Sequence, residues 1–378
     1  AQPFPLWSDP EYQKSFNMVT DYVSDGNREG IRSRIVDFLP VDYPQYLAQA
    51  MPGRTNTWDP DIFFAAVSPP DDKGYCSFGN TLWYSKDLAQ RAKLFVAEID
   101  PTQIRTYGDN FIHVSEIDYL VEESEPMVVS TPPAAAEDQD MINAIGKFAA
   151  TLIQDGDTIQ MGVGPLSESL GLFLDAKNDL GIHSEIMTAA HVEMIKKGIA
   201  TGKYKTLHRG KAVSSFVVGA ADLGFVNNNP AIELYSVLYI NRITTIAAQY
   251  HQVAVNSCLA IDLTGQVSAE SFGGPAMYSG IGGQMDFMMG AMHSEGGRSI
   301  MLLQSTARRG TLSRIVPQLE PGTVVTTPRT YIDNVITEFG IANLAGKTQR
   351  QRAEALIEIA HPDFRADLRK QARKLFWP

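Results

Sequence analysis

The glycine-rich stretch 273–297 is the part of the chain whose composition most plainly suggests chemistry. It reads GGPAMYSGIGGQMDFMMGAMHSEGG and contains eight glycines. Glycine lets the backbone approach a ligand closely and adopts a positive φ without strain. Neighbouring backbone N–H groups can then converge on a negatively charged oxygen. The spacing of Gly280, Gly282 and Gly283 matches neither a Walker loop nor a complete dinucleotide fingerprint, so a set of tight turns is the alternative interpretation.

Several carboxylates, imidazoles and one thiol are candidates to act beside such a loop. A carboxylate or thiolate can be a nucleophile, and an imidazole can exchange a proton near neutral pH. A structural role is the alternative for each: an ion pair, a hydrogen-bonded histidine or a small buried thiol. We expect Asp286 to brace the glycine loop and Glu270 to begin a loop or helix. The candidates are Glu185, Glu193, Glu270, Asp286, His183, His191 and Cys258.

Composition and charge argue against several classes of function. The formal net charge is −11, so neither a nucleic-acid interface nor an anionic membrane surface is expected. A short basic run, His208, Arg209 and Lys211, could hold a phosphate, but we interpret it as a solvated loop. The two cysteines, Cys76 and Cys258, form neither a disulfide framework nor a zinc-binding pattern. We therefore predict a reducing setting and no bound metal.

Two features of the sequence bear on the cellular location of the protein. No apolar run reaches the roughly 18 residues that span a bilayer. The first residues, AQPFPLWSDPEYQ, lack the basic region and apolar core of a signal peptide, although a cleaved signal could precede them. A cytoplasmic location is the prediction.

The elements that must position these groups are predicted to form two α/β domains. A chain of 378 residues is long for a single core. Residues 61–67 and 92–99 are predicted strands, and 85–91 is a predicted helix that joins them. Strand, helix and strand in this order indicate a parallel βαβ unit.

A linker is predicted at 128–136, where two prolines and small residues disfavour a helix or a central strand. It separates an N-terminal domain at 1–130 from a C-terminal domain at 137–378. Helices and strands alternate beyond the linker. The predicted helices are 138–153, 167–174, 349–359 and 366–376, with Pro362 separating the last two, and the predicted strands are 158–161, 212–218, 252–255, 299–303, 323–326 and 335–337.

Long and specific strings along nearly the whole chain match one known family in the same order. They are VSPPDDKGYCSFG at 67–79, YGDNFIHVSEID at 107–118, QMGVGPLSESL at 160–170, GIHSEI at 181–186, VNSCLAIDLTGQVSAESFGG at 255–274, SGIGGQMDFMMGAMHSEGGRSIMLLQST at 279–306, SRIVPQL at 313–319 and VTTPRTYIDNVITEFGIANLAGKTQRQRAEALIEIAHPDFRADL at 325–368. The chain is thereby identified as resembling the acetyl-CoA hydrolase/CoA-transferase family, and in particular 4-hydroxybutyrate/acetate CoA-transferases.

The resemblance implies two α/β domains with the active site between them. It implies acyl-CoA and a carboxylic acid as ligands, and a homodimer or larger oligomer. In the family a glutamate attacks the thioester, CoA returns to give a glutamyl-CoA thioester, and an incoming carboxylate collects the CoA. The glycine loop binds the substrate and stabilises the oxyanion. The matching positions here are Gly280, Gly282, Gly283 and Gln284.

Two strings depart from the family pattern. Read against N-S-A-I-E-V-D-L-x-G, the chain has Ala260 where the family glutamate is expected. Read against H-T-E-M-x-S-D-G, the Ser-Asp pair is Ala189-Ala190, although Glu185 matches a family glutamate. The strand and glycine loop at 155–165 occurs once, so the family's first strand-loop unit is not found. Cys258 would share a strand face with position 260 and is a candidate substitute nucleophile.

Three hypotheses follow for function. The first is an enzyme acting on CoA thioesters, either by CoA transfer to a carboxylic acid or by a diverged acyl-CoA reaction without the covalent glutamate. The second is a non-catalytic CoA-binding subunit that supports an active homologue in a hetero-oligomer. The third is an acyl-CoA hydrolase. A co-purifying homologue that retains the glutamate would favour the second.

Overall fold

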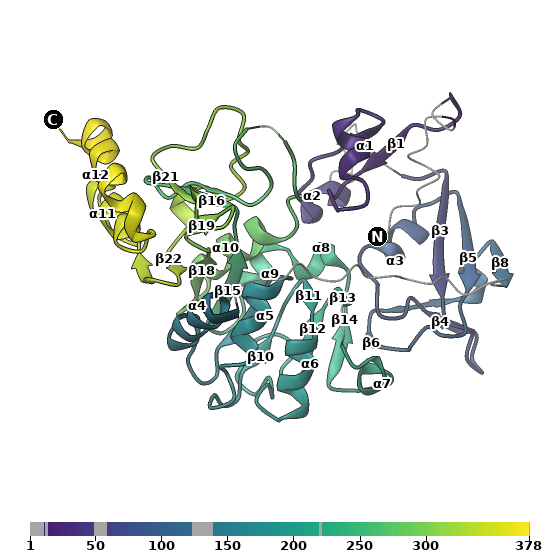
Figure 1. Ribbon diagram of the computed structural model, residues 1–378. Coiled ribbons are helices and arrows are strands. Elements are labelled where there is room, and N and C mark those ends of the chain that lie inside the picture. The colour runs from purple at the N-terminus through teal and green to yellow at the C-terminus, as the bar shows by residue number, and fades with distance from the viewer. Residues whose placement is uncertain are drawn as a thin grey trace.

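The computed structural model describes residues 11, 14–48, 59–122, 139–218, 221–274 and 276–377. The predicted linker at 128–136 lies outside these residues. Figure 1 shows the N-terminal segment with β1, α1 and α2 lying between the β3–β5–β8 sheet and the C-terminal part of the chain. Within the described residues, no helix is both long and apolar enough to cross a membrane.

A sheet of six strands organises the described C-terminal part, in the order β10-β9-β15-β18-β22-β23. Neighbouring strands are parallel except for β22 and β23, which are antiparallel. The central strands are apolar and buried on both faces, as expected for a parallel sheet covered by helices. The strands are β9 (Thr158–Met161), β10 (Gly181–Ile182), β15 (Gln252–Ser257), β18 (Arg298–Leu302), β22 (Asn334–Thr337) and β23 (Gly340–Asn343).

Helices pack against this sheet and follow its strands. Helix α10 contacts β15 and β18, and α4 contacts β18, β22 and β23. Figure 1 shows α11 and α12 together at the C-terminal end of the molecule. The helices are α4 (Gln139–Thr151), α5 (Pro165–Gly171), α6 (Ala189–Lys196), α7 (Leu223–Val226), α8 (Val237–Ile240), α9 (Ile243–Ala247), α10 (Gln284–His293), α11 (Gln349–Glu358) and α12 (Pro362–Phe376), with a 3-10 turn η4 (Arg329–Tyr331).

The N-terminal part contains a parallel sheet in the order β3-β5-β8. Strands β1 and β2 form a separate parallel pair, and β4 pairs antiparallel with β7. The elements are β1 (Met18–Thr20), α1 (Arg28–Arg32), β2 (Val36–Phe38), α2 (Tyr43–Ala48), β3 (Ile62–Val67), β4 (Tyr75–Ser77), α3 (Ser85–Ala89), β5 (Leu94–Ile99), β6 (Tyr107–Gly108), β7 (Phe111–His113), η3 (Val114–Glu116) and β8 (Tyr119–Glu122).

A short sheet connects the N-terminal and C-terminal parts of the chain. Strand β6 from the N-terminal part pairs with β14, so a ladder joins the two sides of the predicted linker. A buried apolar cluster likewise contains residues from both sides, such as Phe95 and Ile159. The remaining strands are β11 (Ile186–Met187), β12 (Ala212–Ser214), β13 (Phe216–Val217), β14 (Ile232–Leu234), β16 (Ala260–Asp262), β17 (Val267–Ser268), β19 (Thr306–Ala307), β20 (Leu312–Ser313) and β21 (Ile315–Val316).

Most predicted elements are confirmed, and the main differences concern 323–326, 212–218 and the starts of two helices. The segment 323–326 is not a strand: Val324 N–H donates to Ser271 Oγ, Thr326 N–H donates to the Val267 carbonyl of β17, and Val267 and Thr327 form an isolated bridge. The predicted strand 212–218 is interrupted at Ser215, giving β12 and β13.

Proline sets the start of two helices earlier than predicted. Helix α5 begins at Pro165 and α12 begins at Pro362. Proline fits the first helical position because the N–H that it lacks would have no partner there. Pro362 therefore opens the last helix instead of lying between two helices.

Candidate active site

The glycine loop runs directly into the N-terminus of α10. Gly282 has a φ of +58°, a left-handed conformation that favours glycine. Gly283 is the N-cap residue, so its backbone N–H and those of the first turn have no partner inside the helix. A Cβ on Gly280 would lie 2.7 Å from the ring of Tyr22, so glycine lets the N-terminal segment close against the loop. The loop therefore presents N–H donors at the positive end of a helix.

Glu185 is the carboxylate that faces this loop. It lies between β10 and β11 and is only 8% exposed. The Gly283 N–H hydrogen-bonds its carboxylate, and Asn241 Nδ2 donates to Oε2 at 3.3 Å. A Cβ at position 283 would lie 1.8 Å from the same Oε2 atom. Only glycine therefore allows the carboxylate to lie against the start of α10.

Opposing effects set the pKa of the Glu185 carboxyl. Burial raises the pKa of its carboxyl to about 7, while the hydrogen bonds from Asn241 and Gly283 act in the lowering direction. A carboxylate with a pKa near neutrality is more basic than an exposed one, and near neutral pH a large fraction of it is ionised. This combination suits a nucleophile.

Asp286 lies in the first turn of α10 and shares Asn241 with Glu185. Asn241 Nδ2 donates to Asp286 Oδ2 at 3.1 Å, so one amide nitrogen bridges two buried carboxyl groups. Burial, followed by the nearby carboxylates of Asp42 and Glu185, raises the pKa of Asp286 well above its ordinary value. Both carboxyl groups therefore hold a proton more tightly than an exposed carboxyl, and for Glu185 the hydrogen bond from the glycine loop acts against this. The prediction that Asp286 braces the loop agrees with this position.

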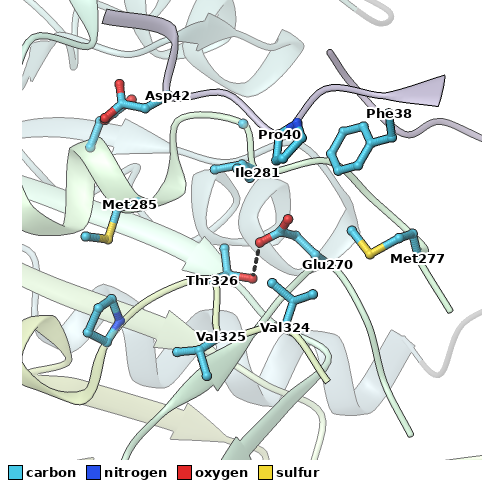
Figure 2. A pocket seen from close by; sticks show the side chains of 13 residues that line it. Phe38, Pro40, Asp42, Glu270, Met277, Ile281, Met285, Val324, Val325 and Thr326 are labelled. Carbon is cyan, nitrogen blue, oxygen red and sulfur yellow. Dashed lines mark hydrogen bonds between the residues drawn. The ribbon is translucent and has the colours of Figure 1, made fainter. Parts of the chain in front are cut away.

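A pocket of about 550 Å³ opens beside the glycine loop. Figure 2 shows Phe38, Pro40 and Asp42 of the N-terminal segment facing Ile281, Met285 and Glu270 across it. The pocket walls are mainly apolar, with three carboxyl groups among them. The lining residues are Phe38, Pro40, Asp42, Glu270, Met277, Ile281, Gly282, Met285, Asp286, Val324, Val325, Thr326 and Pro328.

The N-terminal segment closes one side of this site. Tyr22 Oη and Ser279 Oγ share a hydrogen bond of 3.1 Å, and an Arg28 Nη atom donates to the Tyr278 carbonyl at 2.6 Å. Both contacts join the segment before residue 48 to the residues just before the glycine loop. The site thus lies between the N-terminal and C-terminal parts, as the resemblance implies.

Glu270 lines the pocket from the loop after β17, so of the two expected positions the loop is confirmed and the helix start is not. Thr326 Oγ1 donates to Glu270 Oε1 at 2.8 Å, while the backbone carbonyl of Glu270 accepts from the N–H groups of Tyr278 and Ser279.

The side chain of Gln284 is held by two hydrogen bonds. Its Nε2 donates to the Ser257 carbonyl, and its Oε1 accepts from Thr327 Oγ1. The side chain of Gln284 thus holds the start of α10, and its contribution to ligand binding stays a prediction.

Ala260 and Cys258 are both buried. Ala260 lies in β16 and is paired with Ser268, whereas Glu185 lies directly against Gly283 of the loop. Cys258 belongs to a buried apolar cluster, and burial raises the pKa of its thiol to about 12, so it stays protonated. Position 260 rests on the resemblance alone, and the geometry favours Glu185 as the reactive carboxylate.

The predicted histidines and Glu193 have structural positions. His183 Nε2 donates to the Ile240 carbonyl at 2.9 Å, and His191 Nδ1 accepts from the Thr188 N–H at the start of α6. Burial lowers the pKa of both imidazoles to about 3, so both are neutral. Glu193 lies on the exposed face of α6 and pairs with Lys196.

The Ala189-Ala190 pair and the basic run at 208–211 are also not among the pocket-lining residues. Ala190 packs against α5, where a Cβ on Gly171 would lie 2.8 Å from the Ala190 side chain. In the basic run, His208 and Lys211 both lie beside the Glu233 carboxylate, at 3.3 and 3.5 Å. This pairing agrees with the interpretation of a loop without a phosphate site. Among the residues described, no three His, Cys, Asp or Glu side chains are grouped to hold a metal ion.

Sequence reasoning missed Asn241 and Asp42. Asn241 follows α8 in the string SVLYINR, and nothing in that string marks an amide that bridges two carboxyl groups. Asp42 precedes α2 and reaches the pocket from the N-terminal segment. The sequence offers one signal for an amide shared by two carboxyl groups: Glu185 and Asp286 both lie in strings that match the family.

Comparisons with known proteins identify the family. Family models match at residues 8–132, described as the acetyl-CoA hydrolase/transferase N-terminal domain, and at residues 221–372, described as the C-terminal domain. The 4-hydroxybutyrate coenzyme A transferase of Clostridium kluyveri is 44% identical over 96% of this chain and 83% of its own length. The succinyl-CoA:cyclohexane-1-carboxylate CoA transferase of Geobacter metallireducens is 38% identical over 94% of this chain and 79% of its own length.

Solved structures show the same fold. RipA from Yersinia pestis superposes with a TM-score of 0.87 at 35% identity, covering 97% of this chain and 83% of that chain. The 4-hydroxybutyrate CoA-transferase from Porphyromonas gingivalis superposes with a TM-score of 0.77 at 39% identity, covering 93% of this chain and 84% of that chain.

Proposed function

This chain belongs to the acetyl-CoA hydrolase/transferase family, and we propose that it transfers CoA from an acyl-CoA to a carboxylic acid through a covalent intermediate on Glu185. The coarser statement, an enzyme that acts on CoA thioesters, follows from the family. The observation that supports the finer one is the Glu185 carboxylate held against the Gly283 N–H at the start of α10.

The transfer consists of four substitutions at carbonyl carbon. Glu185 attacks the thioester carbonyl and expels the CoA thiolate, which leaves an acyl-glutamyl anhydride. The thiolate then attacks the glutamyl carbonyl, releases the first carboxylate and gives a glutamyl-CoA thioester. The incoming carboxylate attacks this thioester and expels CoA again. The thiolate finally attacks the new acyl carbonyl, which yields the product acyl-CoA and frees Glu185.

The site supplies what these steps require. Each step passes through a tetrahedral oxyanion, and the N–H groups of Gly283 and the first turn of α10 are donors at the positive end of a helix. The shared Asn241 holds the carboxylate toward those donors. A position only 8% exposed limits the access of water to the intermediate, which favours transfer over hydrolysis.

The experiment that tests this proposal compares two glutamine variants. Glu185→Gln removes the nucleophile and keeps its shape, so we expect kcat for acetyl-CoA-dependent transfer to fall by at least about four orders of magnitude. Glu193→Gln, on the exposed face of α6, is the matched control and should stay within about twofold of the unchanged protein. Full activity of a folded Glu185→Gln protein would refute the proposed nucleophile.

The other two hypotheses are distinguished in the same assay. The non-catalytic subunit was motivated by a missing carboxylate, and Glu185 supplies a carboxylate at the glycine loop. An acyl-CoA hydrolase would release free CoA from acetyl-CoA without any acceptor acid. We expect release of CoA in the absence of acceptor to be slow compared with transfer when acetate, butyrate or another acid is added.

A further inference from the structure

The pocket beside the glycine loop is acidic as well as apolar. Asp42, Glu270 and Asp286 reach it from the N-terminal segment, from the loop after β17 and from α10. Neither lysine, arginine nor histidine is among the described residues that line it. Carboxyl groups from three elements thus surround the space, and no side-chain cation balances them.

The polar atoms of the pocket are mainly acceptors. Oδ1 of Asp42 is buried without a hydrogen-bond partner among the described residues. The hydroxyl of Thr326 already has two hydrogen-bond partners, because it donates to Glu270 and accepts from the Ala269 N–H. A guest with a hydroxyl could therefore find an acceptor, whereas a guest with a carboxylate would find carboxyl groups and no side-chain cation. An anion buried without a partner is strongly disfavoured.

The position of the pocket identifies which part of the substrate it receives. Gly282 and Asp286 line it, and the adjacent Gly283 holds Glu185, so the pocket begins where the thioester carbonyl must lie. The phosphate groups of CoA are excluded by the same carboxylates that exclude any anion. The apolar walls formed by Phe38, Ile281 and Met285 suit a hydrocarbon chain.

We propose that this pocket holds the acyl group and selects uncharged acyl chains, plain or hydroxylated, against chains that end in a second carboxylate. This inference rests on the proposed transfer reaction and names its substrate class. Asp42 and Glu270 are specificity-determining residues in this account. They act from opposite parts of the chain, so the selection does not depend on one side chain.

Three acceptor acids of equal chain length test the selection in the unchanged protein. Butyrate, 4-hydroxybutyrate and succinate differ only in a terminal methyl, hydroxymethyl or carboxylate group. With acetyl-CoA as the donor, we expect kcat/KM for succinate to be at least about tenfold below both others, because a buried carboxylate without a cation as partner is strongly disfavoured. Equal kcat/KM values for succinate and butyrate would overturn the proposal.

Two variants locate the cause of the selection. Glu270→Gln and Asp42→Asn each replace a carboxyl group by an amide of the same shape that can donate to a carboxylate, so each should raise the succinate-to-butyrate ratio of kcat/KM by about fivefold or more. Asp72→Asn is the charge-matched control on an exposed turn and should leave that ratio unchanged. A ratio that stays constant in both pocket variants, with all acids affected equally, would assign the pocket to the pantetheine arm of CoA and overturn the proposal.

Equilibrium binding separates this inference from the proposed reaction. Butyryl-CoA should bind the unchanged protein at least about tenfold more tightly than succinyl-CoA in isothermal calorimetry, whether or not turnover occurs. This preference without any CoA transfer would refute the reaction and keep the pocket assignment. Transfer that proceeds with equal binding of the two thioesters would keep the reaction and refute the pocket assignment.

Discussion

At the residue scale, Glu185 combines burial with donors that stabilise its ionised form. Burial alone would leave the carboxyl protonated, and the N–H of Gly283 and the amide of Asn241 oppose that tendency. Burial and the neighbouring carboxylates of Asp42 and Glu185 raise the pKa of Asp286 well above its ordinary value. The two carboxyl groups share Asn241, but Glu185 also accepts from the Gly283 N–H, which favours Glu185 as the nucleophile.

The first prediction is a pH profile that reports the ionisation of Glu185. Because the ionised form attacks, kcat/KM for acyl-CoA should fall as the pH drops below about 7, the pKa to which burial raises this carboxyl. Removing Asn241 with Asn241→Ala removes a stabilising donor, so the falling limb should move to higher pH. A profile that is flat between pH 5 and pH 8, roughly the range in which a raised carboxyl titrates, would contradict the assignment.

The second prediction concerns stability. The pKa of Glu185 rises from an ordinary 4.5 to about 7 on folding, so the folded state binds the proton more tightly than the unfolded state. Its contribution to the free energy of unfolding is therefore lost as the pH rises from about 4.5 to about 7, by up to about 3 kcal/mol.

Glu185→Gln removes this loss, because the amide cannot ionise. At pH 8, above the raised pKa, we expect the variant to unfold at a higher urea concentration than the unchanged protein, and near pH 4 the difference should shrink. Urea unfolding at the two pH values measures this. A variant less stable at pH 8 than at pH 4, relative to the unchanged protein, would contradict the burial argument.

Residue identities predicted part of this site. The resemblance marked Glu185, and glycine density marked the loop, but the sequence does not show that the two meet. Gly283 and Glu185 come from distant strings, and their contact depends on how β10 and β15 pair with β9. The string that flanks Ala260 matches the family and favours position 260 as the catalytic one, although a matching string does not show which way a side chain points.

At the element scale, the N-terminus of α10 is the feature on which the chemistry depends. Its N-cap glycine allows Glu185 to approach, and Gln284 anchors the first turn through Ser257 and Thr327. The helix itself packs against β15 and β18, which are buried strands of the central sheet. The donors are thus fixed by the core and not by a loop alone.

The third prediction is that a single methyl group at the N-cap abolishes the reaction. The Cβ of Gly283→Ala would lie 1.8 Å from Glu185 Oε2 and 2.5 Å from Asn241 Nδ2, so the carboxylate must move away. We expect kcat to fall by about two orders of magnitude or more, as for loss of an oxyanion donor.

A matched glycine elsewhere provides the control. Gly224→Ala lies in the short helix α7, where the nearest atom to a new Cβ is Asp222 Oδ1 at 3.2 Å. It should keep transfer activity within about twofold, and circular dichroism should show both variants folded. A Gly283→Ala protein with normal kcat would contradict the proposed contact between Glu185 and the loop.

Elements with strong periodicity were predictable and irregular segments were not. The parallel pairing of β3 and β5 followed from strand, helix and strand in the sequence. Residues 323–326 are β-branched, which favours a strand, but their N–H groups donate to the Ser271 side chain and to the Val267 carbonyl of β17. Tertiary contacts decided that segment, and local propensity could not reveal them.

At the scale of the whole molecule, the site exists because distant parts of the chain meet. Phe38, Pro40 and Asp42 come from the N-terminal segment, and the other pocket-lining residues lie after position 269. The contacts from Tyr22 to Ser279 and from Arg28 to Tyr278 hold the two parts together. Family resemblance implied a site between the two parts, but only the fold identifies the residues that form it.

The central claim is that Glu185 carries the CoA during transfer, and trapping the intermediate tests it most directly. The protein would be incubated with acetyl-CoA, treated with hydroxylamine or borohydride, digested and analysed by mass spectrometry. The account predicts a hydroxamate or an alcohol at Glu185, in the peptide that contains GIHSEI, and its absence from the Glu185→Gln variant. A turning-over protein whose modified residue is another carboxylate or Cys258, or that forms no covalent intermediate, would contradict it.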